Sequence, residues 1–370
     1  MKRYVTTALL LGGLLQGLNF AATPARSTAN ARKAAKKKTR YREPVVDPTA
    51  GDNVDGDDLT VRRAAVEALG MVNGSVVVVD PNSGRVLTMV NQKLGLASGF
   101  TPCSTIKLVT SLAALTEHVV NPDANIRINR YESFNLTTAI AHSNNQYFGI
   151  LGNRLGFERV IHYAQMMGFG EKAGVDIAGE QSGQLPTEPP KWGGVGLLTS
   201  FGEGFLVTPL ELAALLSSIA NGGTLYYLQY PRNGSEIEAF APQVKRKLEL
   251  ASGAIADLKV GMRGAVDYGT AKRANYDPNE PILGKTGTCT DFRASHHMGW
   301  FGSFNDVGRH QLVVVVMLAG GTKAVSGPVA AGVAGAIYRN LSEQRYFASG
   351  GTTRPGTPDI LSTYSCCSRQ

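Results

Sequence analysis

The chain has 370 residues, of which 43% are hydrophobic and 18% are charged, a balance that supports a sizeable core and excludes an intrinsically disordered protein. Its formal charge of +8 would suit a nucleic acid or an anionic membrane, but ten of the 37 Lys and Arg residues and only one of the 29 acidic residues fall in residues 1–43. The remainder, with 27 basic and 28 acidic residues, is close to neutral. The basicity therefore belongs to a tail, and no nucleic-acid partner is expected.

The N-terminal residues carry the pattern of an export signal. Lys2 and Arg3 precede an apolar run, so residues 1–22 are interpreted as a signal peptide or, if uncleaved, as an N-terminal anchor. We therefore expect an exported protein of the periplasm or cell envelope, which touches the inner membrane only if residues 4–22 are retained. Residues 23–60 contain almost no large apolar side chains and include a basic run, which predicts a flexible linker. The basic run is either solvated or in contact with acidic envelope polymers or lipid headgroups.

An ordered domain is expected to begin near Leu59 and to span residues 61–345, followed by a disordered tail over residues 346–370. Apolar segments bounded by turn residues predict strands, and apolar residues at helical spacing predict helices. A hairpin is predicted over residues 75–90, with its turn at Pro81-Asn82-Ser83-Gly84. Further predicted elements are helices over 106–115, 137–170, 208–220 and 329–342 and strands over 282–288, 299–304 and 311–318.

Ser104 and Lys107 form an S-x-x-K pattern at the start of the first of these helices. A serine hydroxyl needs a nearby base to act as a nucleophile, and a lysine can serve when burial and positive neighbours lower its pKa. Residues three apart share a helix face, so Lys107 is a candidate base for Ser104. The alternative is an N-capping serine beside a surface lysine. Cys103 before the pair and the apolar Leu108-Val109 after it favour a buried helix start.

Two further polar segments can serve the same reaction. Ser143-Asn144-Asn145 interrupts a helical region. Ser143 is a candidate for passing a proton to the leaving group and Asn145 for holding Lys107 and a substrate amide; the alternative is a helix cap or turn. Lys285-Thr286-Gly287-Thr288 follows an apolar segment, which puts a cation and two hydroxyls on a strand edge where they can bind a substrate carboxylate. Gly287 permits close approach of the backbone.

These three segments, in this order, resemble the motif set of penicillin-reactive serine enzymes. Other stretches are similar to the same family: Gly202 to Ala213, Ala220-Asn221-Gly222-Gly223-Thr224 and Gly269-Thr270-Ala271. Residues from about 72 to 342 thus resemble the transpeptidase domain of penicillin-binding proteins, in the β-lactamase-like superfamily. The resemblance implies an α/β fold of the α+β kind, in which helices flank an antiparallel sheet beside an all-helical subregion.

The resemblance also implies a D,D-transpeptidase that acts on the D-Ala-D-Ala end of peptidoglycan stem peptides, with β-lactams as covalent inhibitors and no cofactor. Thr286, Gly287 and Thr288 would bind substrate, and backbone N–H groups of Ser104 and Thr288 would form the oxyanion hole. The large N-terminal module of high-molecular-weight members is not found before the domain, so a stand-alone transpeptidase domain is expected. The implied catalytic residues are Ser104, Lys107, Ser143, Asn145 and Lys285.

Some carbapenem-hydrolysing class A β-lactamases have a disulfide at similar positions, so the resemblance implies one between Cys103 and Cys289, with two buried free thiols as the alternative. Cys366-Cys367 are interpreted as incidental residues of the tail. His296-His297 has no third ligand at useful spacing, so no metal site is predicted. The glycine-rich Gly193-Gly194-Val195-Gly196 is predicted to form a loop around the cleft.

A serine β-lactamase or a D,D-carboxypeptidase is the second interpretation. A β-lactamase differs from a transpeptidase in whether water can reach the acyl-enzyme, which requires a second base. The chain lacks the Glu-x-x-Leu-Asn loop of class A β-lactamases and has Ser143-Asn144-Asn145 where class D enzymes carry S-x-V. Both differences favour slow deacylation, whereas the cysteine pair points toward a lactamase. The resemblance assigns the nearest glutamate, Glu211, a structural place. A non-catalytic β-lactam sensor is the third interpretation, and it would require several membrane spans or a cytoplasmic effector.

Overall fold

The computed structural model describes residues 47–348, apart from residues 176, 292–295, 307–309 and 321–324. The predicted signal or anchor, most of the predicted linker and nearly all of the predicted tail, including Cys366-Cys367, lie outside the described residues. Within the described part, no helix is both long enough and apolar enough to cross a bilayer.

The strands of the described residues form one five-stranded sheet and two small two-stranded sheets. The strands are β1 Gly74–Asp80, β2 Arg85–Val90, β3 Ile126–Arg127, β4 Ser133–Phe134, β5 Thr224–Tyr226, β6 Val244–Lys247, β7 Ile282–Asp291, β8 His296–Asn305 and β9 Val313–Gly320. The α-helices are α1 Leu59–Leu69, α2 Gln92–Gly95, α3 Lys107–Thr116, α4 Leu136–Ala141, α5 Asn145–Leu155, α6 Phe157–Met166, α7 Gly194–Phe201, α8 Pro209–Ala220, α9 Gly234–Glu238, α10 Ala254–Asp267 and α11 Gly327–Glu343. Two short 3-10 helices are η1 Cys103–Ile106 and η2 Lys272–Ala274.

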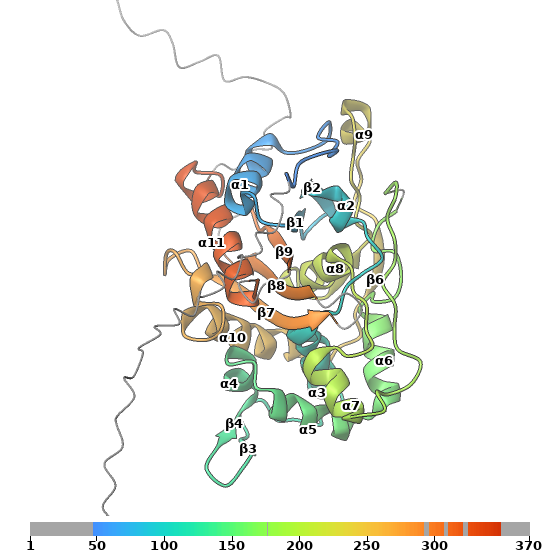
Figure 1. Ribbon diagram of the computed structural model, residues 1–370, viewed down its shortest axis with the longest axis vertical. Helices are drawn as coiled ribbons and strands as arrows, with labels where there is room; N and C mark the ends of the chain where they lie inside the picture. Colours follow the sequence, from blue (N-terminus) through green and yellow to red (C-terminus); the bar gives the residue numbers. More distant parts are fainter. Residues whose placement is uncertain (1–46, 176, 292–295, 307–309, 321–324, 349–370) are drawn as a thin grey trace, which may run out of the picture. The chain divides into compact units, whose positions relative to one another are not determined.

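The large sheet has the order β2-β1-β9-β8-β7, and every neighbouring pair is antiparallel. Both of its faces are covered. Val76 and Val78 pack in a cluster with side chains of α1 and α11, whereas Val77 and Val79 pack in a second cluster with side chains of α3 and α8 (Figure 1). Burial on both faces explains why this strand is a continuous run of valines rather than an alternation of apolar and polar residues.

The predicted fold class is confirmed, because an antiparallel sheet is flanked by helices. Helices α3, α5, α6 and α7 pack against one another, and η1 and α7 bring this helical region against the β7 edge of the sheet. The predicted hairpin, the sheet strands and the helix that starts after Thr208 are also present, the last with a capping box formed by Thr208 and Glu211. The region predicted as mostly helical is divided into α4, α5 and α6. The break between α4 and α5 lies at Ser143, which has a positive φ.

The described structure begins before the boundary expected near Leu59. Asp57 is buried and accepts hydrogen bonds from Arg62 at 3.0 Å, Thr88 at 2.7 Å and Tyr230 at 2.5 Å. At the other end, Tyr346 donates to Asp58 at 3.0 Å. Residues 47–58 are mostly polar, so their composition resembles that of a flexible linker even though buried hydrogen bonds hold them. The sequence alone therefore did not separate them from the basic segment before them.

Candidate active site

Ser104 is the second residue of η1, and Lys107 begins α3 directly after η1 ends. The preceding Cys103 has a left-handed backbone, with φ of 52°, so the chain turns sharply into the helix. Ser104 is 9% exposed and Lys107 is 1% exposed. The two side chains meet on one face, where Lys107 Nζ lies 3.0 Å from Ser104 Oγ. A 3-10 turn, rather than the first turn of an α-helix as the sequence predicted, thus holds the serine beside the lysine.

The tight turn between α4 and α5 brings Ser143 and Asn145 to the same lysine. Ser143 has a φ of 55°, and Asn144 caps α5 by accepting from the backbone N–H of Tyr147. Lys107 Nζ donates to Ser143 O at 2.8 Å, to Ser143 Oγ at 3.0 Å and to Asn145 Oδ1 at 2.6 Å. The lysine is therefore surrounded by oxygen acceptors that fix the position of its nitrogen.

Strand β7 supplies a second buried lysine. Lys285 has no exposed surface, and its Nζ donates to Ser143 Oγ at 2.8 Å and to Thr286 O at 2.9 Å. The Ser143 hydroxyl thus connects Lys107 to Lys285. The structure brings together the nucleophile, both lysines and the Ser-x-Asn turn, which come from three separate parts of the chain.

Thr286, Gly287 and Thr288 of β7 lie near η1, the turn that carries Ser104 and is called the nucleophile turn below. Thr286 Oγ1 lies 2.7 Å from Thr270 Oγ1, and Thr288 Oγ1 accepts from the backbone N–H of Gly327 at 2.8 Å. A Cβ at Gly287 would lie 2.9 Å from Pro102 O and 3.2 Å from the Cys103 Cβ. A side chain at Gly287 would therefore push the strand away from the nucleophile, which explains why the position requires glycine.

Burial controls the protonation of both lysines. Burial, and then the neighbouring charge of Lys285, hold the pKa of Lys107 well below its ordinary value of 10.5. Burial lowers the pKa of Lys285 to about 7. Removing an ammonium group from water disfavours its charged form, and a second cation disfavours it further. Lys107 is therefore suited to act as a neutral base at a pH where an exposed lysine would be fully protonated.

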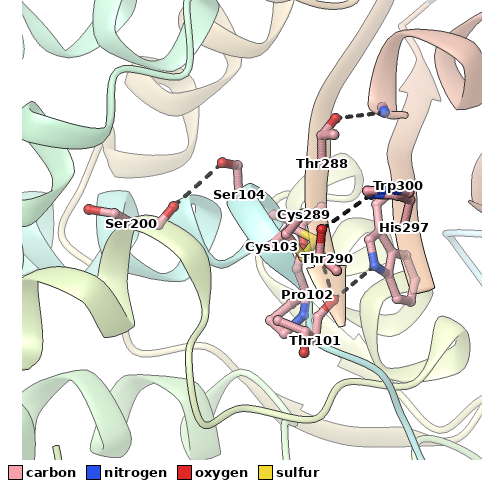
Figure 2. The surroundings of a disulfide bond; sticks show 12 residues. Thr101, Pro102, Cys103, Ser104, Ser200, Thr288, Cys289, Thr290, His297 and Trp300 are labelled. Atoms are coloured by element: carbon pink, nitrogen blue, oxygen red, sulfur yellow. Dashed lines mark hydrogen bonds between the residues drawn. A yellow bond between two sulfur atoms is a disulfide. The ribbon is translucent and has the colours of Figure 1, made fainter. Parts of the chain in front are cut away.

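A disulfide joins the two segments that carry the site. The sulfur atoms of Cys103 and Cys289 lie 1.98 Å apart, and the Cα separation of 5.6 Å is within the normal range for a disulfide. Figure 2 shows Ser104 and Thr288 on the two segments that this bond connects. Trp300 of the adjacent strand donates its indole N–H to Thr101 O at 3.0 Å. The nucleophile turn is therefore fastened to the sheet by a covalent bond and by a buried hydrogen bond.

Helix α7 contributes a contact that the sequence did not indicate. Ser104 Oγ donates to Ser200 O at 3.4 Å (Figure 2). Ser200 Oγ in turn donates to Asn145 O at 2.7 Å. Because Ser200 approaches the nucleophile through its backbone, no residue type could have predicted it. The glycine-rich stretch expected to be a loop instead enters this helix, which begins at Gly194. Thr270, by contrast, belongs to a segment already singled out, but its contact with Thr286 was not foreseen.

Glu211 and His297, for which no catalytic or metal-binding role was predicted, have other contacts. Glu211 lies in α8, where its carboxylate accepts from the backbone N–H groups of Gly170, Gly183 and Thr208. It holds loops together, as the structural interpretation required. His297 Nδ1 lies 3.2 Å from Thr290 Oγ1, and among the described residues no group of three side chains that could hold a metal ion is present.

One known protein family matches most of the chain. The family model "Penicillin binding protein transpeptidase domain" matches residues 74–339. The chain belongs to this family. It is 30% identical to stage V sporulation protein D of Bacillus subtilis over 71% of this chain and 48% of the relative. It is 24% identical to the peptidoglycan D,D-transpeptidase MrdA of Haemophilus influenzae over 74% of this chain and 54% of the relative. The transpeptidase-family chain thus spans about half the length of these curated relatives.

Solved structures share the fold of this transpeptidase-family chain. The transpeptidase domain of penicillin-binding protein 3 from Burkholderia pseudomallei superposes with a TM-score of 0.65 at 20% identity, covering 77% of this chain and 93% of that one. Penicillin-binding protein 2 of Pseudomonas aeruginosa, in complex with WCK 5153, gives a TM-score of 0.65 at 22% identity, covering 78% and 77% of the two chains.

Proposed function

We propose that the chain is a penicillin-binding serine D,D-transpeptidase that acts on peptidoglycan stem peptides through an acyl-Ser104 intermediate. The observation that supports this most is one cluster: Lys107 Nζ lies 3.0 Å from Ser104 Oγ, and Ser143 Oγ connects Lys107 to Lys285. Burying two amines beside one another costs solvation free energy. A helix start with a purely structural role would not require that arrangement.

Acylation uses these groups in sequence. Neutral Lys107 takes the hydroxyl proton of Ser104 as Oγ attacks the carbonyl carbon of the penultimate D-Ala. Backbone N–H groups of Ser104 and Thr288 stabilise the negative charge on the carbonyl oxygen, a contribution of roughly 3–4 kcal/mol per donor in other enzymes. The C–N bond to the terminal D-Ala then breaks. Ser143 passes the proton from Lys107 to the departing amine, which leaves the acyl group on Ser104.

Strand β7 and the Ser-x-Asn turn bind the substrate in this proposal. The charged form of Lys285, with the hydroxyls of Thr286 and Thr288, binds the terminal carboxylate of the stem peptide. Gly287 allows the peptide backbone to lie close to the strand. Asn145 holds Lys107 through its oxygen, at 2.6 Å, and its amide nitrogen would donate to a carbonyl of the substrate.

Slow hydrolysis of the acyl-enzyme distinguishes this proposal from a β-lactamase. Among the described residues, the hydrogen-bond partners of Ser104 Oγ are Lys107 and the Ser200 carbonyl, and no carboxylate contacts it. Burial raises the pKa of Glu211 to about 7, a value suited to a base, but its oxygens are engaged by three backbone N–H groups. Within the part of the chain that the structure describes, no second base contacts Ser104 Oγ to activate water there, which favours attack by an amine.

The proposal includes export to the periplasm or cell envelope, directed by residues 1–22 as a cleaved signal or by residues 4–22 retained in the inner membrane. A disulfide between Cys103 and Cys289 supports this, because disulfides persist in oxidising compartments. Peptidoglycan stem peptides are the proposed substrates there. β-Lactams would act as covalent inhibitors by acylating Ser104 in place of the stem peptide.

Product analysis tests the proposal. The full chain is incubated with a stem pentapeptide ending in D-Ala-D-Ala and with a second stem peptide that offers a free side-chain amine, and the products are separated by liquid chromatography and mass spectrometry. We expect a cross-linked dimer and released D-Ala, both absent after benzylpenicillin treatment and in Ser104→Ala. Release of D-Ala without any dimer would identify a D,D-carboxypeptidase, and rapid destruction of benzylpenicillin would identify a β-lactamase; either result would overturn the proposal.

A further inference from the structure

Two exposed aromatic side chains lie side by side next to the Ser-x-Asn turn. His142 is the residue immediately before Ser143 and is exposed. Tyr268 follows the last residue of α10 and is 45% exposed. Their ring centroids are 5.7 Å apart, with an angle of 52° between the ring planes. We call these two residues the rim pair; the mechanism above does not use them.

Hydrogen bonds of neighbouring residues join the two segments that carry the rim pair to each other and to β7. The backbone N–H of Thr270 donates to Ala141 O at 3.1 Å, so the segment after α10 is joined to the end of α4. A Cβ at Gly269 would lie 2.2 Å from the same carbonyl oxygen, and only glycine permits this approach. The Thr270 side chain then lies 2.7 Å from Thr286 Oγ1 on β7. The rim pair therefore borders the carboxylate-binding side of the site.

The Tyr268 ring also has a defined position. A Cβ at Gly264 would lie 2.6 Å from the Tyr268 hydroxyl oxygen, so the ring extends back along α10 rather than outward into solvent. Helix α10 packs against α4, and the two helices lie next to each other in Figure 1. The rim pair thus forms an exposed aromatic surface where the end of α10 meets the end of α4, next to the Ser143 turn.

The chemistry of the second half-reaction requires a surface in this place. Departure of the terminal D-Ala vacates the carboxylate-binding strand and the position of its amine. The acceptor amine must approach the acyl carbon from that same side, because attack by an amine is the reverse of the departure of one. The chain that carries the acceptor amine then leaves the site past the carboxylate-binding strand. His142 and Tyr268 are exposed on the segments that lead into Ser143 and Thr270, the residues that contact that strand.

We propose that His142 and Tyr268 bind the acceptor stem peptide of the cross-linking reaction. This inference rests on the proposed transpeptidase function. The rings offer an apolar surface to the aliphatic side chain that bears the amine, and an aromatic face attracts an ammonium group before it loses its proton. The acceptor held there also excludes water, so the rim pair favours aminolysis over hydrolysis.

The bonds balance in the step that the rim pair assists. The acceptor nitrogen forms a C–N bond to the acyl carbon, and the ester C–O bond to Ser104 Oγ breaks. One proton of the amine is taken by Lys107 and returned to Ser104 Oγ. The rim pair touches the acceptor but transfers no proton.

Measuring the acceptor dependence of dimer formation by the full chain tests this inference. In His142→Ala, Tyr268→Ala and the double variant, we expect the KM for the acceptor to rise about 3- to 10-fold, the range that loss of an aromatic contact gives. The fraction of donor released as hydrolysed tetrapeptide should rise with it. Acylation by benzylpenicillin, which involves no acceptor, should stay within about twofold, since none of the groups that bind or attack it is changed. Tyr268→Phe keeps the ring and should behave as wild type.

The controls separate the possible failures. Tyr131→Ala removes an aromatic side chain that is 78% exposed on the β3–β4 hairpin, and it should leave the acceptor KM unchanged. An unchanged acceptor KM in the double variant would overturn the inference, as would an equal loss of acylation and of dimer formation in all variants, which a merely structural role would cause. If the wild-type chain forms no dimer at all, the proposed function itself fails.

Discussion

Ser143 Oγ lies 3.0 Å from Lys107 Nζ and 2.8 Å from Lys285 Nζ, so one hydroxyl is shared by two amines that would repel each other if both were charged. The site therefore favours one neutral and one charged lysine. Burial and the adjacent cation hold down the pKa of Lys107, and Lys107 is the lysine in contact with the nucleophile. In the proposed mechanism the same residue type thus supplies a base at one position and a carboxylate-binding cation at the other.

The first prediction concerns the charge of Lys285. In the proposed mechanism acylation requires neutral Lys107, so the acylation rate should rise with pH through the pKa of Lys107. Lys285→Ala removes the nearby positive charge that lowers this pKa, and the rising part of the pH profile for benzylpenicillin acylation should move to higher pH. The maximal rate constant should also fall about 10- to 100-fold, since a hydrogen bond to a charged group contributes roughly 1.5–3 kcal/mol.

Lys285→Arg is the matched control, because it keeps the cation. Its rising limb should stay near the wild-type position even if its maximal rate falls. A rising limb that does not move in Lys285→Ala would contradict the assigned electrostatic coupling between the two lysines.

At the scale of elements, the nucleophile turn η1 and strand β7 act as one unit. Gly287 permits their close approach, and the Cys103–Cys289 disulfide joins them across 186 positions of sequence. The site depends on this junction, because Ser104 lies on one side of it and Thr288 on the other (Figure 2).

The second prediction is that the disulfide stabilises the fold. The double variant Cys103→Ala, Cys289→Ala should lose about 2–4 kcal/mol of unfolding free energy, because a cross-link over a long loop restricts the unfolded chain. Urea denaturation measures the loss, and wild-type protein treated with dithiothreitol should show the same shift. Cys366→Ala with Cys367→Ala is the control and should change stability by less than about 0.5 kcal/mol. A reduced wild type with an unshifted midpoint would argue against the bond.

The third prediction concerns the segment before α1. Arg62 pairs with Asp52 at 2.9 Å and with Asp57 at 3.0 Å, and both carboxylates are almost inaccessible to solvent. Arg62→Ala leaves these charges buried without their cation, which should cost about 3–5 kcal/mol. Arg63→Ala, at the exposed neighbouring position, should change stability by less than about 0.5 kcal/mol. Equal effects of the two substitutions in urea denaturation would show that residues 47–58 are not part of the folding unit.

At the scale of the whole molecule, the sheet separates two cores. One core covers the face under α1 and α11, and the other connects the opposite face to the helical region that carries Ser104 and Ser143. Lys285 comes from the edge strand β7, which meets that region (Figure 1). The site therefore forms where the sheet edge and the helical region meet, and it depends on the packing of both.

The sequence predicted the parts of this arrangement that have local signals. The spacing of Ser104 and Lys107, the valine run of β1 and the Thr208-Pro209 helix start are each encoded within a few residues. It did not predict that Asp57 would be buried by Tyr230, which lies 173 positions away, nor that a backbone carbonyl of Ser200 would reach the nucleophile. Both contacts depend on tertiary packing between distant segments, and the residue types at Asp57 and Ser200 do not indicate them.

The measurement that tests the central claim most directly is the intact mass of the full chain after mixing with benzylpenicillin, followed over hours beside Ser104→Ala. The account predicts that wild type gains the mass of one penicilloyl group and retains it, because no carboxylate of the described residues contacts Ser104 Oγ to activate water, and that Ser104→Ala gains nothing. An adduct that clears quickly while free drug is consumed would contradict the slow deacylation. A folded wild type that forms no adduct, or an adduct that persists in Ser104→Ala, would contradict the assignment of Ser104 as the nucleophile.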